Sequence, residues 1–120
     1  TDLNTLLARQ TATFRTRSRV PMVLRPQNRE QVQECLRIAN RYQIPVYPVS
    51  SGKNWGYGSG VPAGDGVLLD LSAMNRIVDF SEDLAYVTVE PGVTQAQLFQ
   101  FLKQRGSRLW MDATGASAAC

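Results

Sequence analysis

The segment 50–66 holds the residue types most suited to binding a charged ligand. Six of the nine glycines of the chain lie in it, namely Gly52, Gly56, Gly58, Gly60, Gly64 and Gly66. Glycine lets the backbone approach a ligand closely, and successive amides can then turn toward an anion. The Ser50 and Ser51 hydroxyls and the Asn54 amide add donors, and Lys53 adds positive charge. The segment therefore predicts a pyrophosphate site. On composition alone, a glycine-rich surface turn that binds no ligand is an equally good interpretation.

Two common phosphate-binding motifs do not match this segment. The Gly-x-x-x-x-Gly-Lys-Ser/Thr motif requires a hydroxyl residue after its lysine, but Asn54 follows Lys53. The Gly-x-Gly-x-x-Gly motif of dinucleotide-binding folds is not met by Gly56, Gly58 and Gly60. Strand-like rather than helical sequence follows the glycines, which argues against both motifs.

The residue types elsewhere in the chain exclude several kinds of chemistry. There is no histidine, so neither a Ser-His-Asp nor a Cys-His catalytic set can form. Cys35 and Cys120 are far apart and form no Cys-x-x-Cys motif, so we expect no zinc or copper site. Cys35 falls on a predicted apolar helix stripe, where a buried and inert thiol is expected. We assign no catalytic residue and no metal site from the sequence.

Composition places the chain among soluble globular domains. Of the 120 residues, 43% are hydrophobic and 19% are charged, which is enough for one core without disulfides. The net charge of +3 includes a group of arginines at positions 15, 17, 19 and 25, which suits an anionic ligand. Interleaved aromatic residues are lacking there, so we expect no nucleic-acid binding. No apolar run reaches the ~20 residues of a membrane span and no leader is visible, so a cytoplasmic or a periplasmic location is expected.

Periodicity and capping residues predict helices over 28–43 and 94–106. Asn28 with Gln31, and Thr94 with Gln97, have the spacing of a capping box, and Gly106 suits a left-handed helix end. The first helix should bury one apolar stripe, made of Val32, Cys35, Leu36, Ala39 and Tyr42. Apolar and β-branched runs predict strands over 20–24, 44–49, 67–71, 76–80, 85–89 and 109–111. Residues 1–19 read as an arm or a short helix.

These elements predict an α+β fold, with a small mixed β-sheet packed with two main helices. Strand 20–24, the first helix and strand 44–49 form a βαβ-like unit. Strands 76–80 and 85–89 are joined by a short polar turn, which favours antiparallel pairing. The glycine-rich segment then directly follows a strand of the sheet.

Several ordered motifs together resemble the FAD-binding domain of the vanillyl-alcohol oxidase and p-cresol methylhydroxylase flavoprotein family. They are a strand ending in Arg-Pro, a helix, Ile-Pro-Val-Tyr-Pro-Val-Ser-Ser-Gly-Lys-Asn-Trp-Gly-Tyr-Gly, Gly-Val-Leu-Leu-Asp-Leu-Ser-Ala-Met-Asn-Arg-Ile and Val-Glu-Pro-Gly-Val-Thr. The resemblance runs from about Val20 to Gly115. It implies a PCMH-type FAD-binding subdomain in which 20–120 is the N-terminal part. The second half of that domain and a substrate domain would lie outside this sequence.

The resemblance also implies which residues contact FAD. Asp70 and Asn75 match recurrent family positions, and we interpret both as structural because such residues commonly bond to nearby backbone groups. Lys53 stands near the place where relatives similar to berberine bridge enzyme carry a flavin-linked histidine, so attachment through this loop is not expected. The implied cofactor contacts are Pro48, Ser50, Ser51, Gly52, Lys53, Asn54, Gly56, Tyr57, Gly58, Pro91, Gly92, Val93, Thr114 and Gly115.

The function implied by the resemblance is that of an FAD-dependent oxidoreductase. The loop wording is similar to that of members that oxidise a 4-alkylphenol or 4-hydroxybenzylic alcohol by hydride transfer to FAD. Expected partners are this phenolic or alcohol substrate, an electron-acceptor protein such as a cytochrome, and a second copy in a homo-oligomer. Residues 1–120 alone are expected to be inactive. The alternatives are a hydroxy-acid or sugar oxidoreductase of the same superfamily, or a non-catalytic nucleotide-binding module.

Overall fold

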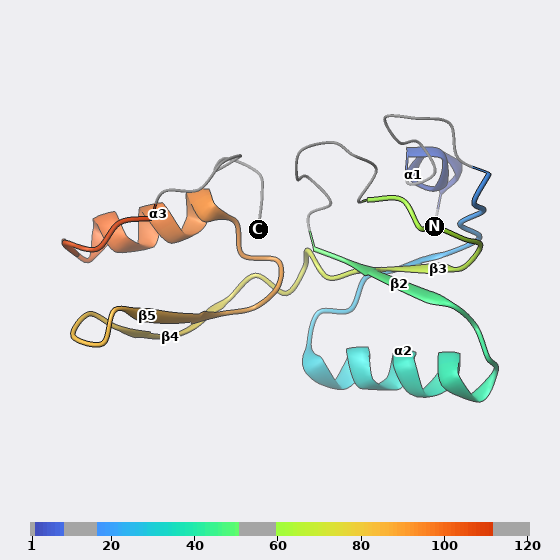
Figure 1. The fold of residues 1–120 in the computed structure, drawn as a ribbon, viewed down its shortest axis with the longest axis horizontal. Coiled ribbons are helices and arrows are strands. Elements are labelled where there is room, and N and C mark those ends of the chain that lie inside the picture. Colours follow the sequence, from blue (N-terminus) through green and yellow to red (C-terminus); the bar gives the residue numbers. More distant parts are fainter. Residues whose placement is uncertain (1, 9–16, 51–59, 112–120) are drawn as a thin grey trace.

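A computed structural model describes residues 2–8, 17–50 and 60–111 of the chain (Figure 1). The fold is α+β, as predicted from the sequence. Its elements, in chain order, are α1 (Leu3–Ala8), β1 (Val23–Leu24), α2 (Arg29–Arg41), β2 (Val46–Val49), β3 (Val67–Asp70), β4 (Ile77–Ser81), β5 (Tyr86–Val89) and α3 (Gln95–Gln104).

The first sheet is parallel, with strand order β1-β3-β2. In its register Leu24 lies opposite Leu69, and Val49 lies opposite Asp70. Helix α1 lies on one face of this sheet and α2 on the other (Figure 1). The central strand β3 is buried along its whole length, as expected for a strand of a parallel sheet that is covered on both faces.

The hydrophobic core belongs to this parallel sheet. Val20, Val49 and Leu68 form its buried cluster. Leu6 of α1 packs against that cluster, together with Val23 and Tyr47 of the sheet. Helix α1 therefore joins the same core as the strands that follow it.

The second sheet is the antiparallel hairpin of β4 and β5, and α3 lies along it (Figure 1). The rings of Phe80 in β4 and Phe101 in α3 pack edge to face, with centroids 5.4 Å apart. The Glu82 carboxylate, in the hairpin turn, accepts hydrogen bonds from the Ser107 hydroxyl at 2.6 Å and the Arg108 amide at 3.1 Å. The antiparallel pairing is thus confirmed. The parallel and antiparallel pairings expected of one mixed sheet are divided between two sheets.

Helix α2 begins as predicted and packs less of its surface than predicted. The Asn28 side chain accepts from the Gln31 amide at 2.9 Å, while the Gln31 side chain accepts from the Gln27 amide rather than from Asn28. Ala39 is buried and Cys35 half-buried, but Leu36 and Tyr42 are 47% and 63% exposed. The predicted stripe is wrong at those two positions: the buried and half-buried side chains of α2 form a narrower stripe of Val32, Cys35 and Ala39.

Both main helices end in the same Schellman arrangement. After α3, Ser107 donates to the Leu102 carbonyl at 3.0 Å, and Gly106 has a φ of 64°, which confirms the predicted left-handed end. After α2, Ile44 donates to the Ala39 carbonyl at 2.8 Å. There the left-handed position is held by Gln43, with a φ of 52°. A side chain at that position carries a steric cost that glycine avoids.

The chain after α3 differs from the sequence-based prediction. Leu109–Met111 is not a strand, because the Leu109 amide donates to the Ser107 hydroxyl at 3.0 Å instead of to a neighbouring strand. The Trp110 side chain is 78% exposed.

The predicted capping box of α3 is confirmed, with Thr94 and Gln97 bonded in both directions. None of the helices among the described residues combines the length and apolar character that crossing a membrane requires.

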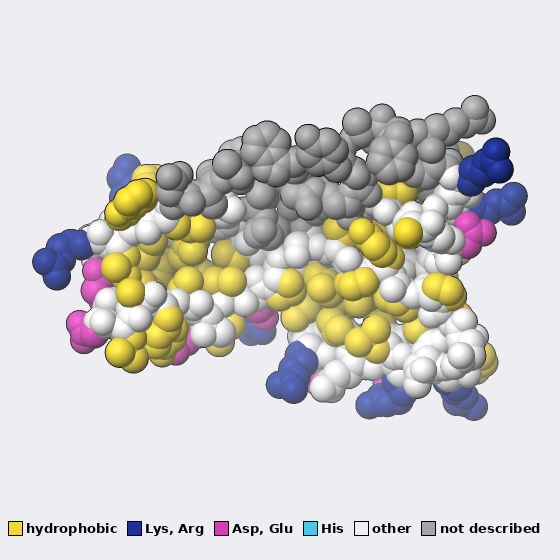
Figure 2. All heavy atoms as spheres, viewed as in Figure 1, with side chains coloured by type: hydrophobic (Ala, Val, Ile, Leu, Met, Phe, Trp, Pro, Cys, Tyr) yellow, Lys and Arg dark blue, Asp and Glu magenta, His cyan; other side chains and the backbone are white. Residues whose placement is uncertain are grey.

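Hydrophobic side chains also reach the surface on the face seen in Figure 2, both over the hairpin part and over the α2 part. Exposed hydrophobic residues of these two parts include Ile38 of α2 and Leu84 of the hairpin turn, which are 47% and 74% exposed. They belong to the two ends of the molecule, away from the turn that joins β3 to β4.

Candidate functional site

The carboxyl ends of the three parallel strands meet at one edge of the sheet. β1 ends at Leu24, β2 at Val49 and β3 at Asp70. The glycine-rich segment follows β2. Ser50 and residues 60–66 are among the described residues, and 51–59 are not. Open parallel sheets bind ligands outside the carboxyl ends of their strands. The predicted ligand loop therefore starts at the edge where a ligand site is expected.

Asp70 is the buried charged group of this edge. Its side chain is 0% exposed, and its Oδ2 accepts from Nη2 of Arg25 at 3.0 Å. Its Oδ1 accepts from the Ser72 amide at 3.0 Å, which agrees with the structural interpretation of this residue. Asn75, interpreted in the same way, is exposed. The Arg25 guanidinium compensates the Asp70 charge, so the buried carboxylate does not oppose a bound anion at this edge.

The predicted Pro91–Val93 contact follows β5 and packs against the turn that follows β3. The Gly92 amide donates to the Met74 carbonyl at 2.7 Å. A Cβ on Gly92 would lie 2.5 Å from the Ser72 carbonyl oxygen, so only glycine fits this approach. Val93 is buried and Pro91 is exposed. The structure thus seats this turn on residues 72–74.

Consecutive backbone hydrogen bonds link the two predicted segments. Leu71 donates to the Val49 carbonyl at 2.8 Å, next to Ser50, and Met74 donates to the Leu71 carbonyl at 3.0 Å. Gly92 then donates to Met74. Ser50, which is half-buried, and the Pro91–Val93 turn are therefore brought to the same end of β3, whereas Pro48 lies exposed within β2.

The remaining predicted contacts lie outside the described residues. They are Ser51, Gly52, Lys53, Asn54, Gly56, Tyr57, Gly58, Thr114 and Gly115. Their contact with FAD stays a prediction. What the described residues contribute fits a dinucleotide phosphate: a hydroxyl at Ser50, a compensated buried carboxylate at Asp70 and a Gly92 turn that brings a second segment to the same edge.

Sequence reasoning missed an ion pair beside the Pro91 turn. The Arg76 amide donates to Oε2 of Glu90 at 2.8 Å, and Nε and Nη2 of Arg76 donate to Oε1 at 3.0 and 2.6 Å. These bonds hold the pKa of the buried Glu90 carboxyl below its usual value. The two residues are 14 positions apart, on strands whose register the sequence alone does not give, so no local signal marks them. The pair fixes the start of β4 to the end of β5.

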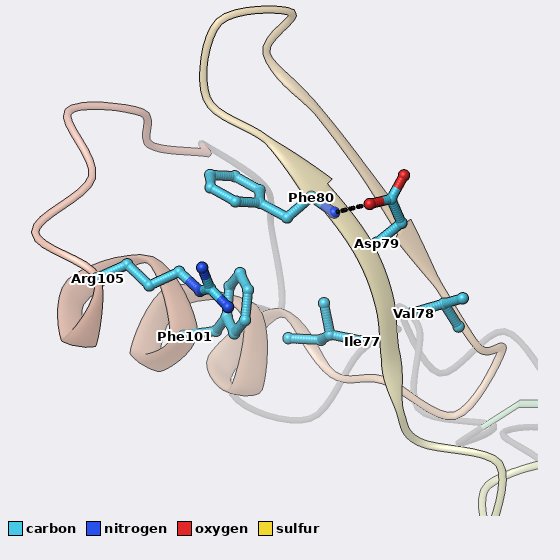
Figure 3. Close-up of a pocket in the computed structure, with 6 residues that line it drawn as sticks. All are labelled: Ile77, Val78, Asp79, Phe80, Phe101 and Arg105. Atoms are coloured by element: carbon cyan, nitrogen blue, oxygen red, sulfur yellow. Dashed lines mark hydrogen bonds between the residues drawn. The ribbon is translucent and has the colours of Figure 1, made fainter.

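A separate pocket of about 210 Å³ lies between β4 and α3 (Figure 3). Arg105 stacks over the Phe101 ring at 4.5 Å, and Ile77 and Phe80 point toward α3. Asp79 points to the other side of β4, where its Oδ2 accepts from the Tyr86 hydroxyl at 2.7 Å and raises the Tyr86 pKa. The lining contains none of the predicted cofactor contacts. The carboxyl edge of the parallel sheet is the better candidate for the site.

Comparison with known proteins gives concordant matches. A family model described as FAD binding domain matches residues 20–120. The chain is 52% identical over 118 residues to 1'-carboxy-chondrochloren decarboxylase from Chondromyces crocatus, covering 98% of this chain and 22% of that protein. It is 38% identical over 90 residues to the flavoprotein subunit of the hydroxylating 4-cresol dehydrogenase from Pseudomonas putida, covering 74% of this chain and 17% of that subunit. The chain spans about a fifth of the length of these curated relatives.

A solved structure matches almost the whole fold. The structure of p-cresol methylhydroxylase with substrate bound superimposes with a TM-score of 0.89 at 27% identity, covering 98% of this chain and 24% of that chain. The match therefore extends over both the parallel sheet and the hairpin with α3. The arrangement of the two sheets around the turn at 70–74 is common to both proteins.

Proposed function

The chain belongs to the family of PCMH-type FAD-binding domains, and we propose that it holds the pyrophosphate of FAD at the carboxyl edge of its parallel sheet. FAD is the cofactor of this family. The observation that carries the proposal is the convergence of Ser50 and the Pro91–Val93 turn at the end of β3. The Ser50 hydroxyl is a donor that a phosphate can accept, whereas the Gly92 and Val93 amides already donate to the Met74 and Glu90 carbonyls. We therefore propose that the backbone amides that bind the phosphate belong to the glycine-rich segment after Ser50.

We further propose that the complete protein is an oxidoreductase. Bound FAD supplies the redox chemistry by accepting a hydride, whereas this domain binds and orients the dinucleotide. A phenolic substrate, such as a 4-alkylphenol or 4-hydroxybenzylic alcohol, is supported by the similarity to the 4-cresol dehydrogenase subunit and to p-cresol methylhydroxylase. We assign no substrate contact to the described residues of this domain.

A second candidate reaction follows from the relative with 52% identity, which is named as a decarboxylase. In that reaction the substrate loses a carboxylate as carbon dioxide. The two candidates share the flavin domain and differ in the bond that breaks, so the fold does not separate them. An assay of the complete protein would separate them. The protein is incubated with 4-ethylphenol and with a carboxylated phenol, and flavin reduction and released carbon dioxide are measured. Carbon dioxide release from the carboxylated substrate alone would contradict the alkylphenol proposal.

The electron acceptor is a further part of the proposal. We propose that a protein acceptor such as a cytochrome reoxidises the flavin, since one relative is named as a flavoprotein subunit. Reoxidation of the substrate-reduced protein by cytochrome c under anaerobic conditions tests this. Fast reoxidation by oxygen with none by cytochrome c would contradict it.

A homo-oligomer is proposed as well and is tested by light scattering on the complete protein.

The cofactor proposal has a direct test. The complete protein is purified, freed of unbound ligand by gel filtration and examined by absorbance. Flavin bands corresponding to about one flavin per chain are expected. If the protein carries no flavin, and its apo form binds neither FAD nor ADP, the pyrophosphate site does not exist.

A further inference from the structure

We propose that Asp70 and Arg25 act as a positioning pair, which holds the two predicted FAD-contacting segments in place relative to each other. This inference rests on the proposed function of the same edge. It assigns a role in cofactor binding to two residues that are not expected to touch FAD themselves.

The first observation is the way the Asp70 carboxylate is buried. Its side chain is 0% exposed, whereas that of Arg25 is 57% exposed. A buried carboxylate is tolerated only when charge and hydrogen bonds compensate its lost hydration. The two oxygens are bonded in different directions, Oδ2 to Arg25 after β1 and Oδ1 to the amide of Ser72 after β3. One carboxylate thus connects the chain after β1 to the turn after β3.

The second observation is what rests on that turn. Leu71, the residue after Asp70, donates to the carbonyl of Val49 and so holds the residue before Ser50. Ser72 and Met74 provide the backbone oxygens against which Gly92 packs, and Met74 accepts from the Gly92 amide. Both segments are therefore supported by the four residues that follow Asp70. A shift of this turn would displace them relative to each other.

The third step is the chemistry of the carboxylate. Its donors include the Arg25 guanidinium and the Ser72 amide, one on each oxygen. An asparagine at position 70 has the same shape but only one acceptor oxygen, so its NH₂ group would face one of those donors. The turn would then have to move to relieve the contact between donors. The pair therefore predicts that the charge of Asp70, and not its volume alone, is needed for FAD binding.

The experiment uses the complete protein in its apo form, with FAD and ADP as the titrated probes. The variants are Asp70→Asn, Arg25→Gln and Arg25→Lys. Arg37→Gln is the matched control, since Arg37 pairs with Glu34 on the exposed surface of α2. Circular dichroism first establishes a denaturant-free condition in which each variant is folded, so that the dissociation constant reports the native state.

Asp70→Asn and Arg25→Gln are each expected to raise the dissociation constants of FAD and ADP about tenfold or more, within the ordinary range of coupling between sites. Arg25→Lys should recover most of the affinity because the ammonium group still pairs with Asp70. Arg37→Gln should bind as the wild type does. If Asp70→Asn does not fold, Asp70→Glu takes its place, because the longer side chain displaces the carboxylate relative to the Ser72 amide, and the same rise in both dissociation constants is expected.

Two results would overturn the positioning role. One is that Asp70→Asn and Arg25→Gln bind FAD and ADP with dissociation constants within about twofold of the wild type, while only the free energy of unfolding is reduced. The other is a loss confined to Arg25→Gln, which would make Arg25 a direct phosphate contact. A wild-type apo protein that binds neither probe would instead reject the proposed function, so the two failures are distinguishable.

Discussion

Replacing Gly92 by alanine tests the close approach on which the second predicted segment depends. The added Cβ would lie 2.5 Å from the carbonyl oxygen of Ser72 and 2.7 Å from that of Met74, closer than the 3.0 Å that real Cβ atoms keep. Both neighbours are backbone atoms, so neither can rotate away as a side chain can. The turn after β3 must move by several tenths of an ångström, and the 2.7 Å bond from Gly92 to Met74 weakens with it.

Three contributions set how far Gly92→Ala lowers the free energy of unfolding. Forcing an extra methyl into a packed site costs about 1–3 kcal/mol, and a weakened backbone hydrogen bond costs up to about 1 kcal/mol. Alanine also restricts the unfolded chain, which returns about 0.4–1 kcal/mol. The free energy of unfolding should therefore fall by about 2 kcal/mol, the middle of the combined range. With a denaturant slope of about 2 kcal/mol/M, the urea midpoint falls by about 1 M.

Urea unfolding followed by far-UV circular dichroism measures this change, and two other glycines provide matched controls. Gly64 has nothing within 4 Å of an added Cβ, so Gly64→Ala should leave the midpoint unchanged or slightly raised. Gly106 also has open space but a φ of 64°, so Gly106→Ala should cost about 1 kcal/mol through the backbone alone. A Gly92→Ala protein as stable as Gly64→Ala would refute the packing argument.

Three further predictions concern helix ends and one ion pair. Gln43→Gly should raise the free energy of unfolding by about 0.5–1 kcal/mol, since Gln43 holds a left-handed backbone at φ 52°; a lower urea midpoint would contradict this. Thr94→Ala should cost about 1 kcal/mol through loss of the capping box, and Thr94→Ser should not; equal midpoints for the two variants would count against the cap. Arg76 holds the pKa of Glu90 low, so the pair stabilises the fold above the unfolded pKa of about 4.3 and loses this effect as the pH falls through the folded value. The difference in midpoint between the wild type and Arg76→Gln should therefore shrink between about pH 5 and pH 3, and a constant difference would show that the charge of Glu90 is not involved.

Local sequence signals predicted most of the elements because their causes are local. The capping box at Thr94 and Gln97 and the left-handed Gly106 depend on residues within a few positions of each other. The predictions that failed required knowledge of neighbours far along the chain. Leu109–Met111 has the composition of a strand, but the nearby Ser107 hydroxyl takes the Leu109 amide. Leu36 matches the helical period of the stripe, yet it is 47% exposed, because the period alone does not say how wide a stripe the neighbouring elements cover.

The candidate site was predictable only where a motif marks it. The glycine-rich segment stands out by composition and the Pro91–Gly92 turn only through the family resemblance, and the structure brings Ser50 and that turn to one edge. The residues that support them do not stand out. Arg25 and Asp70 are 45 positions apart, and their contact depends on the parallel register of β1 and β3, which no spacing in the sequence encodes. Periodicity identifies Asp70 as part of a strand and says nothing of its partner.

The two buried acidic residues among those described, Asp70 and Glu90, lie at the junction between the two sheets. Each is paired with an arginine that is largely exposed, Asp70 with Arg25 and Glu90 with Arg76. Such pairs often add little net stability, because lost hydration offsets the attraction between the charges. Apolar packing supplies the core of the parallel sheet, but it would tolerate several orientations of the hairpin beside it. A carboxylate that accepts two hydrogen bonds tolerates far fewer orientations of the hairpin, because its donors must approach it at fixed angles. We therefore infer that these pairs fix the geometry of the junction, and that removing one partner of either pair will lower both the cofactor affinity and the free energy of unfolding, because it leaves a buried carboxylate without its arginine.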